Sequence, residues 1–208
     1  MKVSIYVADA SHINYAEEIS ALVYISAQER GTGIAKRSPE VITKKILEGK
    51  AVIAICEDYP NPEGKKFAGF SYVESWSNGE FVSNSGLIVA HEFRKMGLAR
   101  KIKNRIFQHS RDLYPNAKVF SITTGLAVMK MNSSLGFKPV TFSEVSQDPK
   151  FWEGCKGCQN YDILLRTASE KCLCTALVFD PKDEHSLEIA AKTMESSDGP
   201  LYIKAPSK

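Results

Sequence analysis

The segment of residues 94–101 has the residue types and the spacing that bind phosphate. It follows a short apolar run at residues 86–90 and leads into an amphipathic segment rich in Lys and Arg. A strand, a tight turn and a helix in this order would direct free backbone N–H groups and the side chains of Arg94, Lys95 and Arg100 to one point. Because a helix N-terminus carries unpaired donors and partial positive charge, we expect phosphate to bind there.

The composition is that of an ordinary globular protein. The chain has 208 residues, a net charge of +3 and 43% hydrophobic residues, which fits one domain with or without an appendage. The small charge does not favour nucleic acid as a partner, and no apolar run is long enough to span a membrane. Residues 1–7 look like a strand and not like a signal peptide, so we expect a cytosolic protein whose five cysteines are thiols or metal ligands.

Hydrophobic periodicity predicts a mixed α/β fold with one central sheet. Helices are expected at residues 12–29, from Ser38–Pro39 to Gly49, and at 97–114, 127–135 and 184–194. Strands are expected at residues 2–8, 51–56, 67–74, 81–90, 119–124, 137–145 and 161–166, with a further strand considered at 172–179.

Two motifs together resemble the GCN5-related N-acetyltransferase (GNAT) superfamily. Residues 94–99, Arg-Lys-Met-Gly-Leu-Ala, match the signature Arg/Gln-x-x-Gly-x-Gly/Ala. Residues 132–137, Asn-Ser-Ser-Leu-Gly-Phe, resemble the second signature, a short helix that ends in Leu-Gly-Phe. The resemblance implies an acetyltransferase domain at residues 1–166, with a mostly antiparallel central sheet flanked by helices. Residues 167–208 would form a C-terminal extension, a strand plus a helical tail.

The resemblance implies that acetyl-CoA binds where the strand ending at Val89 separates from the strand at residues 119–124. Unpaired backbone groups would hold the pantetheine arm, and the amides of residues 95–100 would surround the pyrophosphate. Gly97 matters because a Cβ there would block the approach of the backbone to phosphate. Considered without the second motif, the same residues could equally be the start of a helix with a basic surface. The expected cofactor-binding residues are Leu87, Ile88, Val89, Arg94, Lys95, Met96, Gly97, Leu98, Ala99, Arg100 and Asn132.

The resemblance also implies direct transfer of the acetyl group to an amine. A base must take the proton of the amine, and Glu74 or Glu80 could do so through a water; the alternative is that both are solvated carboxylates. The backbone N–H of Val89 would polarise the thioester carbonyl. Family members keep a Tyr, which protonates the leaving thiolate, where this chain has Asn132; an amide donates a hydrogen bond to sulfur but no proton.

A finer resemblance concerns the acceptor. Three segments are similar to the acetyltransferase domain of N-acetylglutamate synthases: Gly33–Glu40, Val52–Cys56, and Ile122–Thr124 followed by Leu135–Phe137. This chain lacks the amino-acid-kinase domain of those proteins, and its Thr-Thr to Gly-Phe interval is two residues longer. The similarity implies a small-molecule acceptor, such as the α-amine of glutamate or another amino acid, with Arg37 pairing with its carboxylate. Arg37 could equally be an exposed residue before a helix. The alternatives are a protein amine, a polyamine, an antibiotic, or a non-catalytic acyl-CoA sensor; a homodimer is also considered.

Four cysteines have the spacing C-x2-C-x13-C-x-C. They are Cys155, Cys158, Cys172 and Cys174. If the second pair lies on a strand, its two sulfurs point to one face, and four thiolates could bind one zinc ion. Alternatively, Cys172 and Cys174 are small core residues and the first pair are loop thiols.

Overall fold

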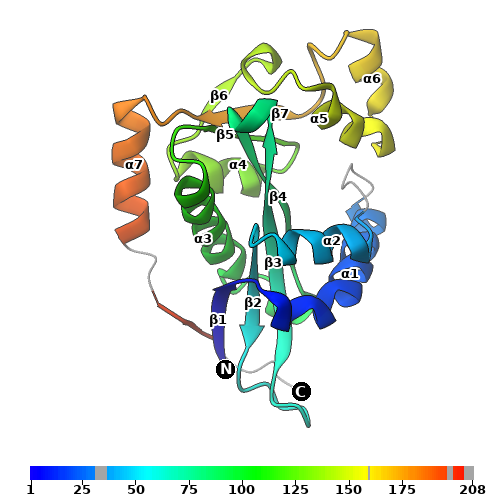
Figure 1. The fold of residues 1–208 in the computed structure, drawn as a ribbon, viewed down its shortest axis with the longest axis vertical. Helices are drawn as coiled ribbons and strands as arrows, with labels where there is room; N and C mark the ends of the chain where they lie inside the picture. The colour runs from blue at the N-terminus through cyan, green and yellow to red at the C-terminus, as the bar shows by residue number, and fades with distance from the viewer. Residues whose placement is uncertain (31–36, 159, 196–198, 204–208) are drawn as a thin grey trace.

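The protein is built around one eight-stranded sheet with the strand order β6-β7-β5-β4-β3-β2-β1-β8. The computed structural model describes residues 1–30, 37–158, 160–195 and 199–203. All neighbouring strands are antiparallel except β4 and β5, which are parallel. The predicted mixed, mostly antiparallel sheet is therefore confirmed (Figure 1). The strands are β1 (Lys2–Val7), β2 (Ala51–Cys56), β3 (Lys66–Trp76), β4 (Phe81–Val89), β5 (Lys118–Thr123), β6 (Lys138–Val140), β7 (Thr175–Phe179) and β8 (Leu201–Tyr202).

Helices flank this sheet, with α1 and α2 on one side and α3 on the other (Figure 1). None of the helices in the described ranges combines the length and apolarity that a membrane crossing requires. The helices are α1 (Ala16–Arg30), α2 (Pro39–Leu47), α3 (Leu98–Leu113), α4 (Leu126–Ser133), α5 (Pro149–Glu153), α6 (Tyr161–Arg166) and α7 (Glu184–Glu195).

The residues predicted to begin and end helices lie at helix ends in the structure, as the start and end of α2 show. Ser38 caps α2 by accepting a hydrogen bond from the Val41 amide at 3.5 Å, and Pro39 occupies the first turn. Gly49, with a φ of +64°, follows the end of that helix. In α3, Leu98, Ile102 and Ile106 are buried as predicted, whereas Leu113 is 43% exposed. Phe107 is buried in addition, so the buried apolar face of α3 ends more than one turn before the helix does.

The segment between β6 and β7 differs most from the expectation. The strand predicted at residues 161–166 is wrong, because these residues form helix α6. The helix buries Leu164 on one face and places an Asp162–Arg166 ion pair, at 3.1 Å, on another. The strand predicted at 137–145 shortens to β6, since Thr141 and Glu144 form a capping box that begins a 3-10 turn. Residues 142–174, called here the roof, carry α5 and α6 at one end of the sheet (Figure 1).

The C-terminal part of the chain is joined to the rest through the sheet. β7 pairs with β5 on one edge and with β6 on the other. It begins only at Thr175, later than the strand considered at 172–179. The predicted helix of the tail is confirmed as α7, and β8 then pairs with β1. A domain boundary at residue 166 stays a prediction, and the extension beyond it supplies an inner strand.

Candidate active site

The strands β4 and β5 separate at the middle of the sheet. They pair only from Phe81 to Ser83 in β4 and from Lys118 to Phe120 in β5. Just beyond this point, the register between β3 and β4 shifts, and Gly86 has a φ of +66°. A Cβ on Gly86 would lie 2.7 Å from the Tyr72 ring, so a glycine is needed for this bulge. A cavity of about 480 Å³ opens where the two strands separate.

The backbone of β4 presents an open edge along this separation. The Ala90 amide donates to the Ala68 carbonyl in β3 at 3.0 Å. Because backbone groups alternate in direction along a strand, the N–H and C=O groups of Leu87 and Val89 face away from β3, and those of Ile88 face towards it. Of the three residues predicted to hold pantetheine, Leu87 therefore directs both backbone groups to the open edge. Val89 directs its N–H there, because its carbonyl already accepts from the Arg94 side chain.

The turn before α3 has the backbone geometry of an anion site. Gly97, the N-cap of α3, has a φ of +81°, and Lys95 has a φ of +62°. Among the described residues, no side chain caps the first turn of α3, and the Arg100 amide already donates to the Gly97 carbonyl at 3.1 Å. The amides of Leu98 and Ala99 are therefore the ones available to a ligand. A Cβ on Gly97 would meet nothing within 4 Å, which means that the space above this glycine is open.

The side chain of Arg94 links the end of β4 to α1. Its Nε donates to the Val89 carbonyl and its Nη2 to the Ser26 hydroxyl, each at 3.0 Å, and Glu29 lies 3.6 Å from Nη1. This guanidinium therefore holds the strand end in place. Its contribution to cofactor binding, like those of Met96, Leu98, Ala99 and Arg100, stays a prediction.

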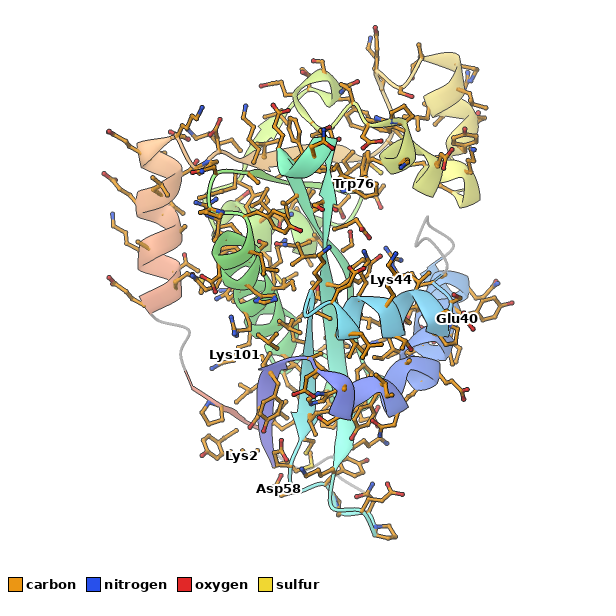
Figure 2. All side chains as sticks on the ribbon, viewed as in Figure 1. Lys2, Glu40, Lys44, Asp58, Trp76 and Lys101 are labelled. Carbon is orange, nitrogen blue, oxygen red and sulfur yellow. The ribbon has the colours of Figure 1, made fainter. Side chains whose placement is uncertain are left out.

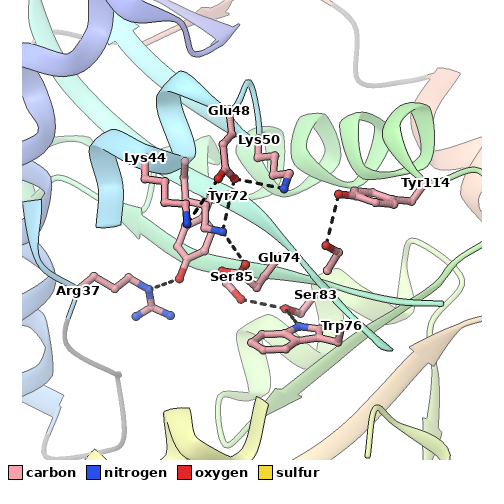
Figure 3. A network of polar contacts seen from close by, with 12 residues as sticks. Arg37, Lys44, Glu48, Lys50, Tyr72, Glu74, Trp76, Ser83, Ser85 and Tyr114 are labelled. Carbon is pink, nitrogen blue, oxygen red and sulfur yellow. Dashed lines mark hydrogen bonds and ion pairs between the residues drawn. The ribbon is translucent and has the colours of Figure 1, made fainter. Parts of the chain in front are cut away.

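One end of the cavity is polar (Figure 3). The Nε of Arg37 donates to the Tyr72 hydroxyl at 2.7 Å, and the carboxylate of Glu74 pairs with Lys45 at 2.5 Å. Arg37, Tyr72 and Glu74 all line the cavity. Glu80, by contrast, is exposed and is absent from the described cavity wall. Of the two candidate bases, Glu74 is therefore the one at the cavity. Residues 33–36, which belong to the finer resemblance, lie outside the described residues.

The other end of the cavity is aromatic. Figure 2 shows Trp76 where β3 reaches the roof, far from Lys2 and Asp58 at the opposite end of the sheet. Rings from β3, β5 and the roof surround this end, and sequence spacing did not reveal them as one wall. They belong to Trp76, Phe120, Phe142, Phe151, Trp152 and Tyr161.

The four roof cysteines line the same aromatic end. Burial raises the pKa of Cys155, and burial together with the neighbouring Cys172 raises the pKa of Cys174 to about 12. Cys172 and Cys174 precede β7 and so do not share a strand face. Among the described residues, no three Cys, His, Asp or Glu side chains are arranged to hold a metal ion. The predicted zinc site is therefore not supported. Cys56 is buried in the core, as expected.

Two polar side chains, those of Asn132 and Lys103, are buried and are not part of the described cavity wall. Asn132 is 0% exposed, and neither polar atom of its side chain has a hydrogen-bond partner among the described residues. Lys103 of α3, 3% exposed, donates to the Asn84 side chain at 3.1 Å. Burial lowers the pKa of Lys103 to about 7. Asn132 is marked by its motif in the sequence, whereas no sequence pattern singles out Lys103.

Comparison with solved structures identifies the fold. No protein-family model matches the sequence, and no curated protein matches it either. N-acetylglutamate synthase from Neisseria gonorrhoeae, solved with coenzyme A and N-acetyl-glutamate, superposes with a TM-score of 0.58 at 16% identity over 87% of this chain. This chain spans only about a third of that protein, since 35% of its length is covered.

Two further structures match over nearly their whole length. An acetyltransferase of the GNAT family from Staphylococcus aureus has a TM-score of 0.54 at 13% identity, covering 86% of this chain and 99% of the other. A GNAT phosphinothricin acetyltransferase from Sinorhizobium meliloti, in complex with acetyl-CoA, has a TM-score of 0.52 at 14% identity, covering 86% and 87%. The chain therefore has the GNAT fold.

Proposed function

We propose that this protein is an acyl-CoA-dependent N-acetyltransferase that moves an acetyl group from acetyl-CoA to the amine of a small molecule, such as the α-amine of glutamate or another amino acid. The observation that carries the proposal is the separation of β4 and β5 beyond Ser83, which leaves an open strand edge leading to the uncapped start of α3. Structural neighbours solved with coenzyme A or acetyl-CoA support it.

The proposed cofactor site uses backbone groups along its whole length. Leu87 and Val89 hold the pantetheine arm in the manner of a neighbouring strand. The amides of residues 95–100 surround the pyrophosphate, where the N-terminus of α3 stabilises negative charge. The Val89 N–H stabilises the oxyanion that forms on the thioester carbonyl.

The amine must lose a proton before it attacks the thioester. Glu74 is placed to accept that proton, directly or through a water, and its ion pair with Lys45 fixes the carboxylate at the cavity. The amine nitrogen then forms the amide bond, the carbon–sulfur bond breaks, and the thiolate of coenzyme A leaves. For Asn132 to donate a hydrogen bond to the departing sulfur, its fully buried amide must become accessible when acetyl-CoA binds. The proton that completes the thiol comes from solvent.

A non-catalytic acyl-CoA sensor is the second candidate. It is favoured by the full burial of Asn132 at the position where the family keeps its acid. Calorimetric titration with acetyl-CoA tests the binding that both candidates share. A panel of amines, with release of free coenzyme A thiol as the readout, separates the two candidates. We expect thiol release with at least one amine. If acetyl-CoA binds but no amine causes thiol release, the acyl-CoA sensor is the candidate that remains. A cytosolic location, a place in amino-acid metabolism and a homodimer stay predictions.

Asn132→Ala is expected to lower kcat by roughly tenfold, the range of one transition-state contact, with little change in acetyl-CoA affinity. Because the wild-type amide is buried without a partner, the variant should be no less stable in urea. A drop in kcat with unchanged stability marks a role at the sulfur, while an unchanged kcat would mean that the thiolate leaves without this contact.

Arg37→Lys is expected to raise the KM for an amino-acid acceptor by about tenfold and to leave acetyl-CoA affinity unchanged. Lysine keeps the charge but loses the planar fork that binds both carboxylate oxygens. The lost bond to the Tyr72 hydroxyl is a local change, so melting temperature serves as the control. Equal KM values for the two proteins would remove Arg37 from the acceptor site.

A further inference from the structure

The cavity changes character along one strand. Tyr72, Glu74 and Trp76 alternate along β3 and all line the cavity, so they follow one another on the same face of the sheet. At one end, the Tyr72 hydroxyl accepts a hydrogen bond from Arg37; Glu74 provides a carboxylate in the middle, and Trp76 begins the aromatic end. Along the strand, the cavity therefore offers first a cation that could bind a carboxylate, then a candidate base, and then an apolar wall.

The aromatic end offers few hydrogen bonds to a ligand. The indole N–H of Trp76 already donates to the Ser83 hydroxyl at 3.0 Å, and that of Trp152 donates to the Ser146 carbonyl at 3.1 Å. The two tryptophans therefore present carbon surface to the cavity. Phe151 contacts both, with ring centroids 5.4 Å from Trp76 and 4.9 Å from Trp152, so the wall is one connected set of rings.

The remaining groups at this end do not compensate a negative charge. Cys155 and Cys174, whose raised pKa values keep them as neutral thiols near pH 7, act as small apolar groups. Among the described wall residues from the roof, Lys150 is the charged one, and it is exposed to solvent. Asn160 and Tyr161 add neutral polar groups to this wall, but a ligand carboxylate placed among these rings would lose its hydration without gaining a buried cation.

We propose that the acceptor is an α-amino acid with a large aromatic or aliphatic side chain, and not glutamate. Its side chain packs on Trp76, Phe151 and Trp152, its α-amine lies at Glu74, and its α-carboxylate lies at Arg37. This inference rests on the proposed function and replaces glutamate as the first acceptor to be tested.

The protein itself provides a binding signal that does not depend on turnover. Its two tryptophans are Trp76 and Trp152, and both line the cavity. Titration with L-phenylalanine or L-leucine is therefore expected to give a saturable change in tryptophan emission excited at a wavelength that phenylalanine does not absorb. L-Glutamate at the same concentrations is expected to give none. A saturable response to glutamate alone would overturn the inference.

The thiol-release assay then compares phenylalanine, leucine, glutamate, phenylalanine amide and phenethylamine. We expect kcat/KM to be at least about tenfold higher for phenylalanine or leucine than for glutamate, with the two compounds that lack a carboxylate also poor. Equal or better turnover of glutamate overturns the inference and leaves the acetyltransferase proposal standing, as does equal turnover of phenylalanine amide. Emission changes without thiol release for any amine would support the ligand class and refute the transfer reaction.

A variant of the wall tests the same point independently of folding. Trp152→Arg places a cation among the rings and is expected to shift the ratio of kcat/KM for glutamate over phenylalanine upward by at least about tenfold. A partial loss of folding lowers the activity with both substrates alike and cannot mimic this shift. An unchanged ratio in the variant that melts cooperatively would count against the inference. Tyr202→Ala in β8, an exposed aromatic residue at the far edge of the sheet, is the matched control and should leave the ratio as in the wild type.

Discussion

Gly97→Val is expected to abolish acetyl-CoA binding while the protein stays folded. Gly97 is the N-cap of α3, and the space where its Cβ would lie is open. A valine side chain there would occupy the position from which the pyrophosphate approaches the first amides of the helix. Calorimetric titration with acetyl-CoA measures the effect, and wild-type affinity in the variant would show that the cofactor binds elsewhere.

Gly49→Val is the matched control for this variant. Gly49 has a φ of +64°, close to the +81° of Gly97, and a Cβ on either residue meets nothing within 4 Å. Both substitutions therefore cost a similar strain, about 1–2 kcal/mol for an ordinary side chain in the left-handed region. Gly49 follows α2, away from the proposed phosphate site, so we expect Gly49→Val to lower the melting temperature comparably and to bind acetyl-CoA normally.

Lys103→Met is expected to stabilise the protein at neutral and acidic pH. Burial lowers the pKa of Lys103 from 10.5 to about 7, so between these values the unfolded state binds a proton that the folded state does not. The wild type therefore gains stability as pH rises from about 7 to about 10.5, and below pH 7 it carries the full penalty of a buried cation. That penalty is on the order of 5 kcal/mol.

Methionine has a similar length and no charge, but it leaves the Asn84 side-chain oxygen without its hydrogen bond, which costs about 1–3 kcal/mol. The net gain in the free energy of unfolding should be about 2–4 kcal/mol at pH 6 and should disappear by about pH 10. Urea unfolding at these two pH values measures it. Lys130→Met, at an exposed position of α4, is the control and should change the free energy of unfolding by the same small amount at both pH values. A gain in Lys103→Met that does not depend on pH would contradict the lowered pKa of Lys103.

The sequence predicted the elements that have strong local signals. The strand at residues 51–56 is a continuous apolar run, and it is buried at every position in the sheet. The start of α2 has its serine and proline, and the turn at Gly97 has its motif. These features depend on neighbours in the chain, which is why composition and periodicity capture them.

The roof and its aromatic wall were not predicted, because their signals are not local. Helix α6 has six residues and three consecutive apolar side chains, Ile163, Leu164 and Leu165, which fit a buried strand as well as a helix. The wall brings together Trp76, Phe120 and Phe151 from three separate segments, so their spacing carries no information. Lys103 was not predicted for a different reason. Lysines on a basic helix are nearly always solvated, whereas this one is buried by tertiary packing, with Asn84 and the Phe137 ring near its side-chain nitrogen.

The position of β7 has a consequence for how the molecule assembles. The cavity opens where β5 separates from β4. The other edge of β5 pairs with β7, which follows α4, β6, α5 and α6 in the chain. Closing so long a loop has an entropic cost that local contacts do not offset. The cofactor side of the sheet and the roof over the acceptor should therefore become ordered in one late cooperative step. In the native protein, a local opening of β7 would release both halves of the site together, and a protease would find its first cuts in the roof.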